Sequence, residues 1–179
     1  MKIIVVFYCA LCLEYRERYG YKMSETTINV GYLADYPDLI LTCASWAYGQ
    51  WGCQSGGSLK HAVARFTEGA NKERIPLTLV ALDKKKPVGM ISLWKSDFNK
   101  RPDLSPWVAS LFVHPFYRSN HIASFLIKKL EVEARRLGYI RLFLVTEEAK
   151  NLYIRHKWEE LEQVKTIHGH AVLMSKDLS

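Results

Sequence analysis

Hydrophobic and polar positions follow two different periods along the chain, and the changes of period mark the expected elements. Short apolar runs predict strands, and apolar residues at helical spacing predict helices. The expected strands cover 27–33, 77–82, 88–94, 108–113, 141–146, 161–167 and 170–175. The expected helices cover 37–48, 59–70, 120–137 and 148–156. This order predicts an α/β (α+β) fold with a mixed sheet of about seven strands flanked by about four helices.

The longest predicted helix, 120–137, follows the strand 108–113 after a short turn. Its apolar face consists of Ile122, Phe125, Leu126, Leu130, Ala134 and Leu137. Polar side chains, Glu131 among them, fill most of the other positions, and Gly138 is a natural stop. The next strand, 141–146, should lie parallel to 108–113, because a right-handed crossover joins parallel strands. Such a strand-loop-helix unit directs unpaired N–H groups and the positive end of the helix dipole at one point, which suits a phosphate.

The loop before this helix reads Tyr117-Arg-Ser-Asn-His-Ile-Ala123. It resembles the pyrophosphate-binding motif of the GNAT superfamily of acetyl-CoA-dependent N-acetyltransferases. That pattern is Arg or Gln, two residues, Gly, one residue, then Gly or Ala. Arg118 and Ala123 match it, and His121 stands where the family prefers Gly. Because a Gly lets the backbone approach phosphates closely, His121 either contacts a phosphate itself or weakens cofactor binding.

A second segment, 149–158, is similar to the family's short-helix motif, in which Leu-Tyr is followed after three residues by Gly-Phe. Tyr153 falls on the position of the family's usual general acid, and Lys157 and Trp158 replace the Gly-Phe pair. A phenol can protonate a leaving thiolate, because its reference pKa of about 10 lies above that of a thiol. The alternative is that Tyr153 is an ordinary packing residue.

The resemblance covers roughly residues 27–178 and implies the GNAT fold, with a splayed pair of parallel strands. The pantetheine arm of acetyl-CoA would lie in the gap between them, paired with backbone groups of Leu111 and Val113, and one N–H would polarise the thioester carbonyl. The cofactor-binding residues that the resemblance implies are Leu111, Phe112, Val113, Arg118, Ser119, Asn120, His121, Ile122, Ala123, Ser124 and Thr146. Thr146 stands where Asn is common in the family.

These patterns predict a cytoplasmic N-acetyltransferase that transfers an acetyl group from acetyl-CoA to a primary amine of a small molecule or a protein N-terminus. Its expected partners are coenzyme A and an amine-bearing acceptor, and it should act as a monomer or homodimer. Because His121, Lys157 and Trp158 depart from the family patterns, a non-catalytic acyl-CoA-binding module is the alternative.

The general base and the acceptor pocket stay open at this point. Candidates for the base, besides a chain of water molecules, are Glu147, Glu148, Asp103, Asp97 and His114. Aromatic side chains that could line an acceptor pocket are Trp46, Tyr48, Trp51 and Trp107. Charged residues at strand ends are usually just solvated, and aromatic residues at helical spacing are more often core.

Composition narrows the choice of partner only slightly. The chain has 179 residues, 49% of them hydrophobic and 12% aromatic, which indicates a single globular domain. Its formal charge of +7 favours anionic partners, and coenzyme A, nucleic acid and acidic membranes all qualify. The basic residues are scattered rather than grouped with aromatic residues, so we expect neither nucleic acid nor a membrane as partner.

The first 22 residues differ in character from the rest, and an apolar run, 3–13, is too short to span a membrane. We expect residues 1–22 to be an extension outside the fold, with Met23 as the natural start of an acetyltransferase domain, 23–179. The four cysteines are Cys9, Cys12, Cys43 and Cys53. The CxxC that the first two form lacks a second ligand pair, and His168 and His170 lack a third ligand, so we expect no metal.

Overall fold

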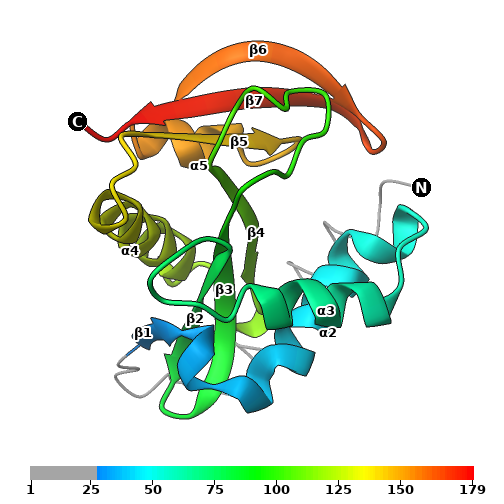
Figure 1. Cartoon of the computed structure of the whole chain (residues 1–179), viewed down its shortest axis with the longest axis vertical. Helices are drawn as coiled ribbons and strands as arrows, with labels where there is room; N and C mark the ends of the chain where they lie inside the picture. The colour runs from blue at the N-terminus through cyan, green and yellow to red at the C-terminus, as the bar shows by residue number, and fades with distance from the viewer. Residues whose placement is uncertain (1–27) are drawn as a thin grey trace, which may run out of the picture.

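A mixed seven-stranded sheet runs through the computed structural model, which describes residues 28–179 (Figure 1). The strands are β1 (Ile28–Tyr32), β2 (Leu77–Asp83), β3 (Lys86–Trp94), β4 (Trp107–Val113), β5 (Arg141–Thr146), β6 (Glu159–Thr166) and β7 (Gly169–Asp177). The helices are α2 (Ile40–Gln50), α3 (Leu59–Glu68), α4 (Ile122–Arg136) and α5 (Lys150–Arg155). Single 3-10 turns lie at Leu33–Asp35, Pro37–Leu39, Gly52–Gln54 and Pro115–Tyr117. The predicted order of elements is confirmed, whereas the proposed extension, its boundary at Met23 and the CxxC lie outside the described residues.

The strands follow the order β1-β2-β3-β4-β5-β7-β6, and only the central β4–β5 pair is parallel. All the other neighbours are antiparallel. Helices cover both faces of the sheet, with α4 on one side and α2 and α3 on the other (Figure 1). This is the mixed sheet with a central parallel crossover that the sequence predicts.

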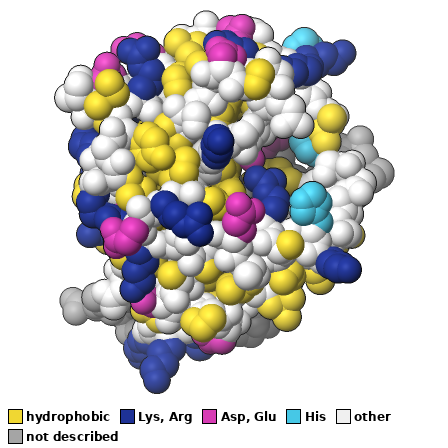
Figure 2. All heavy atoms as spheres, in the orientation of Figure 1, with side chains coloured by type: hydrophobic (Ala, Val, Ile, Leu, Met, Phe, Trp, Pro, Cys, Tyr) yellow, Lys and Arg dark blue, Asp and Glu magenta, His cyan; other side chains and the backbone are white. Residues whose placement is uncertain are grey.

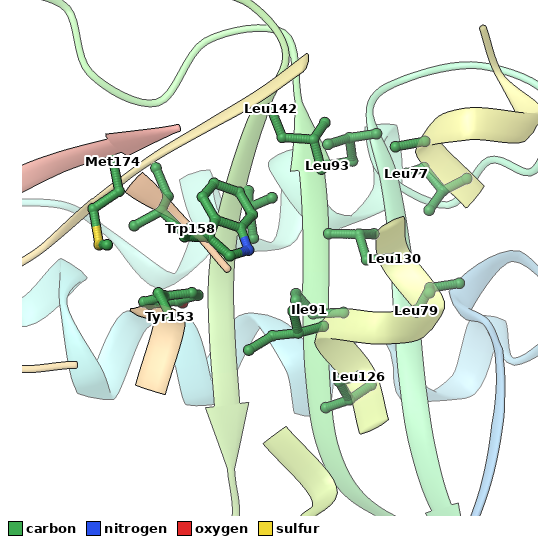
Figure 3. Packing of buried hydrophobic residues seen from close by; sticks show 14 of the residues in the cluster. Leu77, Leu79, Ile91, Leu93, Leu126, Leu130, Leu142, Tyr153, Trp158 and Met174 are labelled. Carbon is green, nitrogen blue, oxygen red and sulfur yellow. The ribbon is translucent and has the colours of Figure 1, made fainter. Parts of the chain in front are cut away.

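A large apolar cluster joins α4 and α5 to the sheet. Leu126 and Leu130 of α4 pack over Leu79, Ile91 and Leu93 of the sheet, and Tyr153 and Trp158 close one end of the cluster (Figure 3). On the opposite face, a second cluster packs α2 and α3 against β2 and β3; its buried members are Leu33, Leu39, Cys43, Ala44, Phe66, Val80, Leu82 and Met90. The two clusters fix the central strands from both sides, so the functional loops project from a rigid core.

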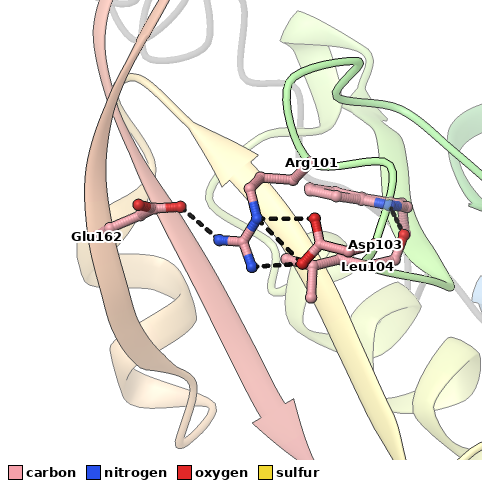
Figure 4. A network of polar contacts seen from close by, with 5 residues as sticks. Arg101, Asp103, Leu104 and Glu162 are labelled. Atoms are coloured by element: carbon pink, nitrogen blue, oxygen red, sulfur yellow. Dashed lines mark hydrogen bonds and ion pairs between the residues drawn. The ribbon is translucent and has the colours of Figure 1, made fainter.

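The loop between β3 and β4 folds over the far half of the sheet. Arg101 in this loop donates to Asp103 and reaches across to Glu162 of β6, with Nη1–Oε1 at 2.6 Å (Figure 4). Beneath the loop, Trp107 is fully buried against Phe143 and donates its indole N–H to a backbone carbonyl in the loop. The expectation that Trp107 lines an acceptor pocket is therefore wrong, because this loop covers it.

Helix α4 differs from the sequence prediction in two respects. It begins at Ile122 rather than near Asn120, because His121 takes a left-handed conformation with φ 58°. The expectation that Glu131 lies on the solvent-facing side is also wrong, since this residue is only 6% exposed. Its carboxylate lies between the indole of Trp158 and the ammonium of Lys176, which together satisfy a charge that the helical pattern alone places in water.

No helix within residues 28–179 is long and apolar enough to cross a bilayer. The same part of the chain holds no group of three or more His, Cys, Asp or Glu side chains arranged to bind a metal ion.

Candidate active site

The two parallel strands at the centre of the sheet separate soon after they meet. Trp107 and Phe143 are the one pair that β4 and β5 form, and the Phe143 N–H donates to the carbonyl of Pro106 at 3.1 Å. Beyond this point, the rest of β4 runs beside β5 without a ladder between the described strands. A strand edge left open in this way presents peptide groups that an extended ligand can pair with.

A bulge in β4 sets which peptide groups face the opening. Ser110 has φ 53°, and the pairing with β3 shifts between Met90 and Ser92. The N–H of His114 donates to Val88 of β3 at 2.9 Å. Because successive residues of a strand direct their peptide groups to opposite edges, those of Val113 and Leu111 face the β5 side. The peptide groups of Val113 and Leu111 therefore face the side on which the resemblance places the pantetheine arm, whereas Phe112, paired with Met90, directs its own peptide groups toward β3.

The loop after β4 closes on itself through side chains. Asn120 donates from its amide to the carbonyls of Tyr117 and Arg118, both at 3.0 Å. Ser119 and His121 both have positive φ, 63° and 58°. This compact turn leads directly into α4, whose first N–H groups have no partner within the helix, and such a junction is an anion-binding geometry.

Arg118 is exposed, but its side chain turns back to the end of β4. Its Nε donates to the carbonyl of Val113 at 3.1 Å. A guanidinium has five N–H donors, so this bond leaves donors that suit phosphate oxygens. Of the predicted residues from Arg118 to Ser124, Ile122 is buried in the core cluster, and the others are exposed or partly exposed at the end of β4.

Tyr153 lies on α5, the short helix that follows β5. The helix begins close to the strand because Thr146, the last residue of β5, accepts the N–H of Ala149 on its Oγ1 at 3.0 Å. Tyr153 is only 6% exposed, and this burial raises the pKa of its phenol. A phenol with a raised pKa keeps its proton at neutral pH, as a general acid must. Thr146 thereby has a structural role at the start of α5, in addition to its predicted place in the cofactor site.

Comparison with known families identifies this arrangement. Residues 40–161, which include the gap, the loop and Tyr153, match the model of the acetyltransferase (GNAT) family. The chain belongs to this family.

Solved structures agree with the GNAT assignment at the level of the fold. An aminoglycoside 6'-N-acetyltransferase complexed with coenzyme A has a TM-score of 0.68 and 16% identity, over 84% of this chain and 97% of that one. The aminoglycoside 6'-N-acetyltransferase from Enterococcus faecium has a TM-score of 0.66 and 17% identity, over the same shares of 84% and 97%. Ard1 from Thermoplasma volcanium has a TM-score of 0.64 and 13% identity, again over 84% and 97%. No curated protein sequence matches the chain.

The two places where this GNAT chain lacks an expected Gly share one backbone feature. His121 has φ 58° and Lys157 has φ 61°, so both side chains stand in the left-handed region. Gly adopts this region without steric cost, which explains the preference at both positions of the family patterns. The GNAT backbone is therefore kept here, and the departures add a Cβ and a side chain to it.

We predict that His121→Gly stabilises the protein slightly and tightens its binding of coenzyme A. Relief of the left-handed conformation stabilises the folded state by about 1–2 kcal/mol. The greater conformational entropy of Gly in the unfolded chain offsets about 0.4–1 kcal/mol of this. Thermal unfolding and calorimetric titration would measure the two effects. His121→Ala is the matched control, because it removes the imidazole and keeps the Cβ. Weaker binding in both variants would show that the imidazole itself contacts a phosphate.

The structure separates the candidates for the general base. Asp103 is paired with Arg101, which holds the pKa of this carboxyl below its usual value, so Asp103 is a weak base. His114 stacks on Phe116 beside the phosphate loop, with ring centroids 5.5 Å apart, and burial lowers its pKa. Asp97, Glu147 and Glu148 are all exposed, so exposure does not separate these three. Asp97 and Glu147 differ from Glu148 in that the charge of Glu147 acts on Asp97.

Asp97 and Glu147 come from different elements but interact. Asp97 lies in the loop after β3, 3.4 Å from Arg65 of α3, and Glu147 at the end of β5 accepts from Thr166 at 2.9 Å. Burial raises the pKa of Asp97, Arg65 opposes this, and the charge of Glu147 raises it further. The Asp97 side chain nevertheless keeps 39% of its surface exposed. Figure 2 shows a hollow between the α3 side and the end with β6 and β7.

We predict that Asp97→Asn removes the acidic limb from the pH profile of kcat/KM and lowers its plateau about 100-fold. A base acts when deprotonated, so kcat/KM falls as pH drops through the Asp97 pKa. Because burial raises that pKa, the fall begins at a higher pH than for an ordinary Asp. Glu147→Gln is the matched variant, and Asp103→Asn is the control that should change nothing. An acidic limb that persists in Asp97→Asn but disappears in Glu147→Gln would assign the base to Glu147.

Proposed function

We propose that the chain transfers an acetyl group from acetyl-CoA to a primary amine of a small molecule or a protein N-terminus. The observation that carries this proposal is the presence of three features on the two separating strands, β4 and β5, and on the segments that follow them. These are the open strand edge, the anion-binding loop and the protonated phenol of Tyr153. Each serves a different part of acetyl-CoA: the pantetheine arm, the pyrophosphate and the leaving sulfur.

In the proposed reaction, the peptide N–H groups of Leu111 and Val113 hold the pantetheine arm and one of them faces the thioester oxygen. A preorganised donor there stabilises the negative charge that the oxygen gains when the amine nitrogen attacks the carbonyl carbon. The phenol of Tyr153 gives its proton to the thiolate as the carbon–sulfur bond breaks. Asp97 or Glu147 takes the proton that the amine nitrogen loses, directly or through water. The products are an amide and coenzyme A.

The acceptor site that we propose is the hollow beside α3. Asp97, 3.4 Å from Arg65 of α3, and Glu147, whose charge acts on Asp97, favour an acceptor that carries a positive charge. Trp46 and Trp51 of the α2 region are partly buried and pack against the cluster on that face of the sheet. Two of the similar structures are aminoglycoside 6'-N-acetyltransferases, so aminoglycosides belong among the amines to be tried.

A coupled assay tests the proposal against the non-catalytic alternative. The full chain is incubated with acetyl-CoA and a panel of aminoglycosides, polyamines and peptides with free N-termini, and free thiol is detected as coenzyme A is released. We expect amine-dependent thiol release that saturates with at least one acceptor class. Tight acetyl-CoA binding without turnover on any amine would favour the acyl-CoA-binding module instead.

A further inference from the structure

A buried carboxylate of α4 connects three elements next to Tyr153. The Oε1 of Glu131 accepts from Nε1 of Trp158 at 3.1 Å, and both carboxylate oxygens accept from Nζ of Lys176 at 2.9 Å. The side chains of Lys176 and Glu131 are 13% and 8% exposed. A buried charge must be paired and hydrogen-bonded, and this one has partners on both sides. Glu131 therefore ties α4 to β7 and to the segment that follows α5.

The same network holds the end of the helix that carries Tyr153. The Lys176 ammonium also donates to the carbonyl of His156 at 2.5 Å, just after the last residue of α5. The backbone carbonyl of Tyr153 accepts from the N–H groups of His156 and Trp158 at 2.9 and 3.1 Å. The carboxyl end of α5 is thus fixed to β7 through Lys176 and to α4 through Trp158.

Trp158 contacts the ring of Tyr153, so the position of the indole also limits the position of the phenol ring. The two rings lie edge to face, with centroids 5.7 Å apart and planes at 64° (Figure 3). The orientation of the indole is set by its bond to Glu131, because a ring with an N–H donor bonded to a fixed acceptor cannot rotate freely. The family pattern has Phe at this position, and Phe has no donor for such a bond. In this chain Trp158 therefore supplies a hydrogen-bond donor that Phe lacks, and the buried Glu131 supplies its acceptor.

We propose that Glu131, together with Lys176, is a positioning residue that sets the Tyr153 phenol through Trp158. This inference rests on the proposed function, in which Tyr153 donates the proton to the leaving sulfur. Helix α5 comprises the six residues Lys150–Arg155 and buries Tyr153 alone, so the position of the ring depends on contacts outside the helix, Trp158 among them. A displacement of a catalytic group by about 1 Å can cost about 100-fold in rate.

A double-mutant cycle on kcat tests the proposal with the full chain. Trp158→Phe keeps most of the ring packing and removes the donor to Glu131. We expect it to lower kcat about tenfold with an unchanged KM for acetyl-CoA, since the cofactor surface at β4 is untouched. In a Tyr153→Phe background, the same substitution should lower kcat no further, because the group that it positions is absent. Glu131→Gln, which keeps an oxygen acceptor for the indole, should retain more of kcat than Glu131→Leu.

Each outcome of the cycle distinguishes this proposal from the proposed function. If Trp158→Phe lowers kcat by the same factor with and without Tyr153, its effect is structural and the positioning role is overturned. If kcat does not change, the role is also overturned, while turnover of the unaltered protein still supports the enzyme. If the unaltered protein turns over none of the amines, both the proposed acetyl transfer and the positioning role are overturned. Lys129→Gln, on the exposed face of α4, is the control and should leave kcat and the melting temperature unchanged.

Discussion

Replacing Tyr153 with Phe is expected to lower kcat by about 100-fold to 10,000-fold while the Kd for acetyl-CoA stays the same. The phenol is buried, and burial raises its pKa further above neutral pH. In the proposed reaction it gives its proton to the leaving sulfur. Phe keeps the ring contact with Trp158 and loses only the hydroxyl. A proton donor acts in the transition state, so its loss should appear in kcat rather than in binding.

Steady-state kinetics and calorimetry together measure this prediction for Tyr153→Phe. Tyr139→Phe is a matched control, since Tyr139 is a partly buried residue that packs against the same apolar cluster. Thermal unfolding of both variants checks that the fold is kept. An unchanged kcat in Tyr153→Phe would exclude this residue from the mechanism and would support its interpretation as a packing residue.

Lys176→Met is expected to destabilise the protein by about 3–5 kcal/mol, because it leaves the buried Glu131 carboxylate without its counter-ion. The Lys176 ammonium contacts both oxygens of that carboxylate at 2.9 Å. Removing one partner of a buried pair costs far more than removing an exposed charge, since the remaining ion cannot return to water. Urea unfolding at neutral pH would measure the loss.

Two further variants show whether the buried charge is the cause. Lys60→Met, on the exposed surface of α3, should change the free energy of unfolding by no more than about 0.5 kcal/mol. The double variant Glu131→Leu with Lys176→Met should be more stable than Lys176→Met alone, because no unpaired charge is left. A loss below about 1 kcal/mol in Lys176→Met would mean that water reaches the Glu131 carboxylate and screens it.

The centre of the fold could be predicted because local pattern and tertiary structure agree there. The apolar run of β4 and the helical period of α4 are long and unbroken, and the handedness of crossovers makes β4 and β5 parallel. The loop from Arg118 to Ala123 could be predicted because it contains a recognisable sequence motif. Tyr153 could be placed from its motif, although the sequence did not show that the phenol is buried.

Other features depend on residues far apart in the chain and leave little local signal. The bulge at Ser110 has a positive φ that the identity of this residue does not indicate. Glu131 is buried by Lys176, which lies 45 positions away, so the helical pattern alone placed it in solvent. The effect of the Glu147 charge on Asp97 likewise depends on how two segments far apart in the chain are arranged. In each case tertiary contacts outweigh the local pattern.

In the proposed function, the open edge of β4 and the loop after it bind acetyl-CoA. Calorimetric titration of the full chain with acetyl-CoA tests this most directly, with pantetheine, which lacks the pyrophosphate, as the control. We expect saturable binding with a Kd in the micromolar range, about 8 kcal/mol, and much weaker binding of pantetheine. Failure to bind acetyl-CoA at millimolar concentration would contradict the proposed function, and would show that His121 closes the phosphate site of an otherwise intact GNAT fold.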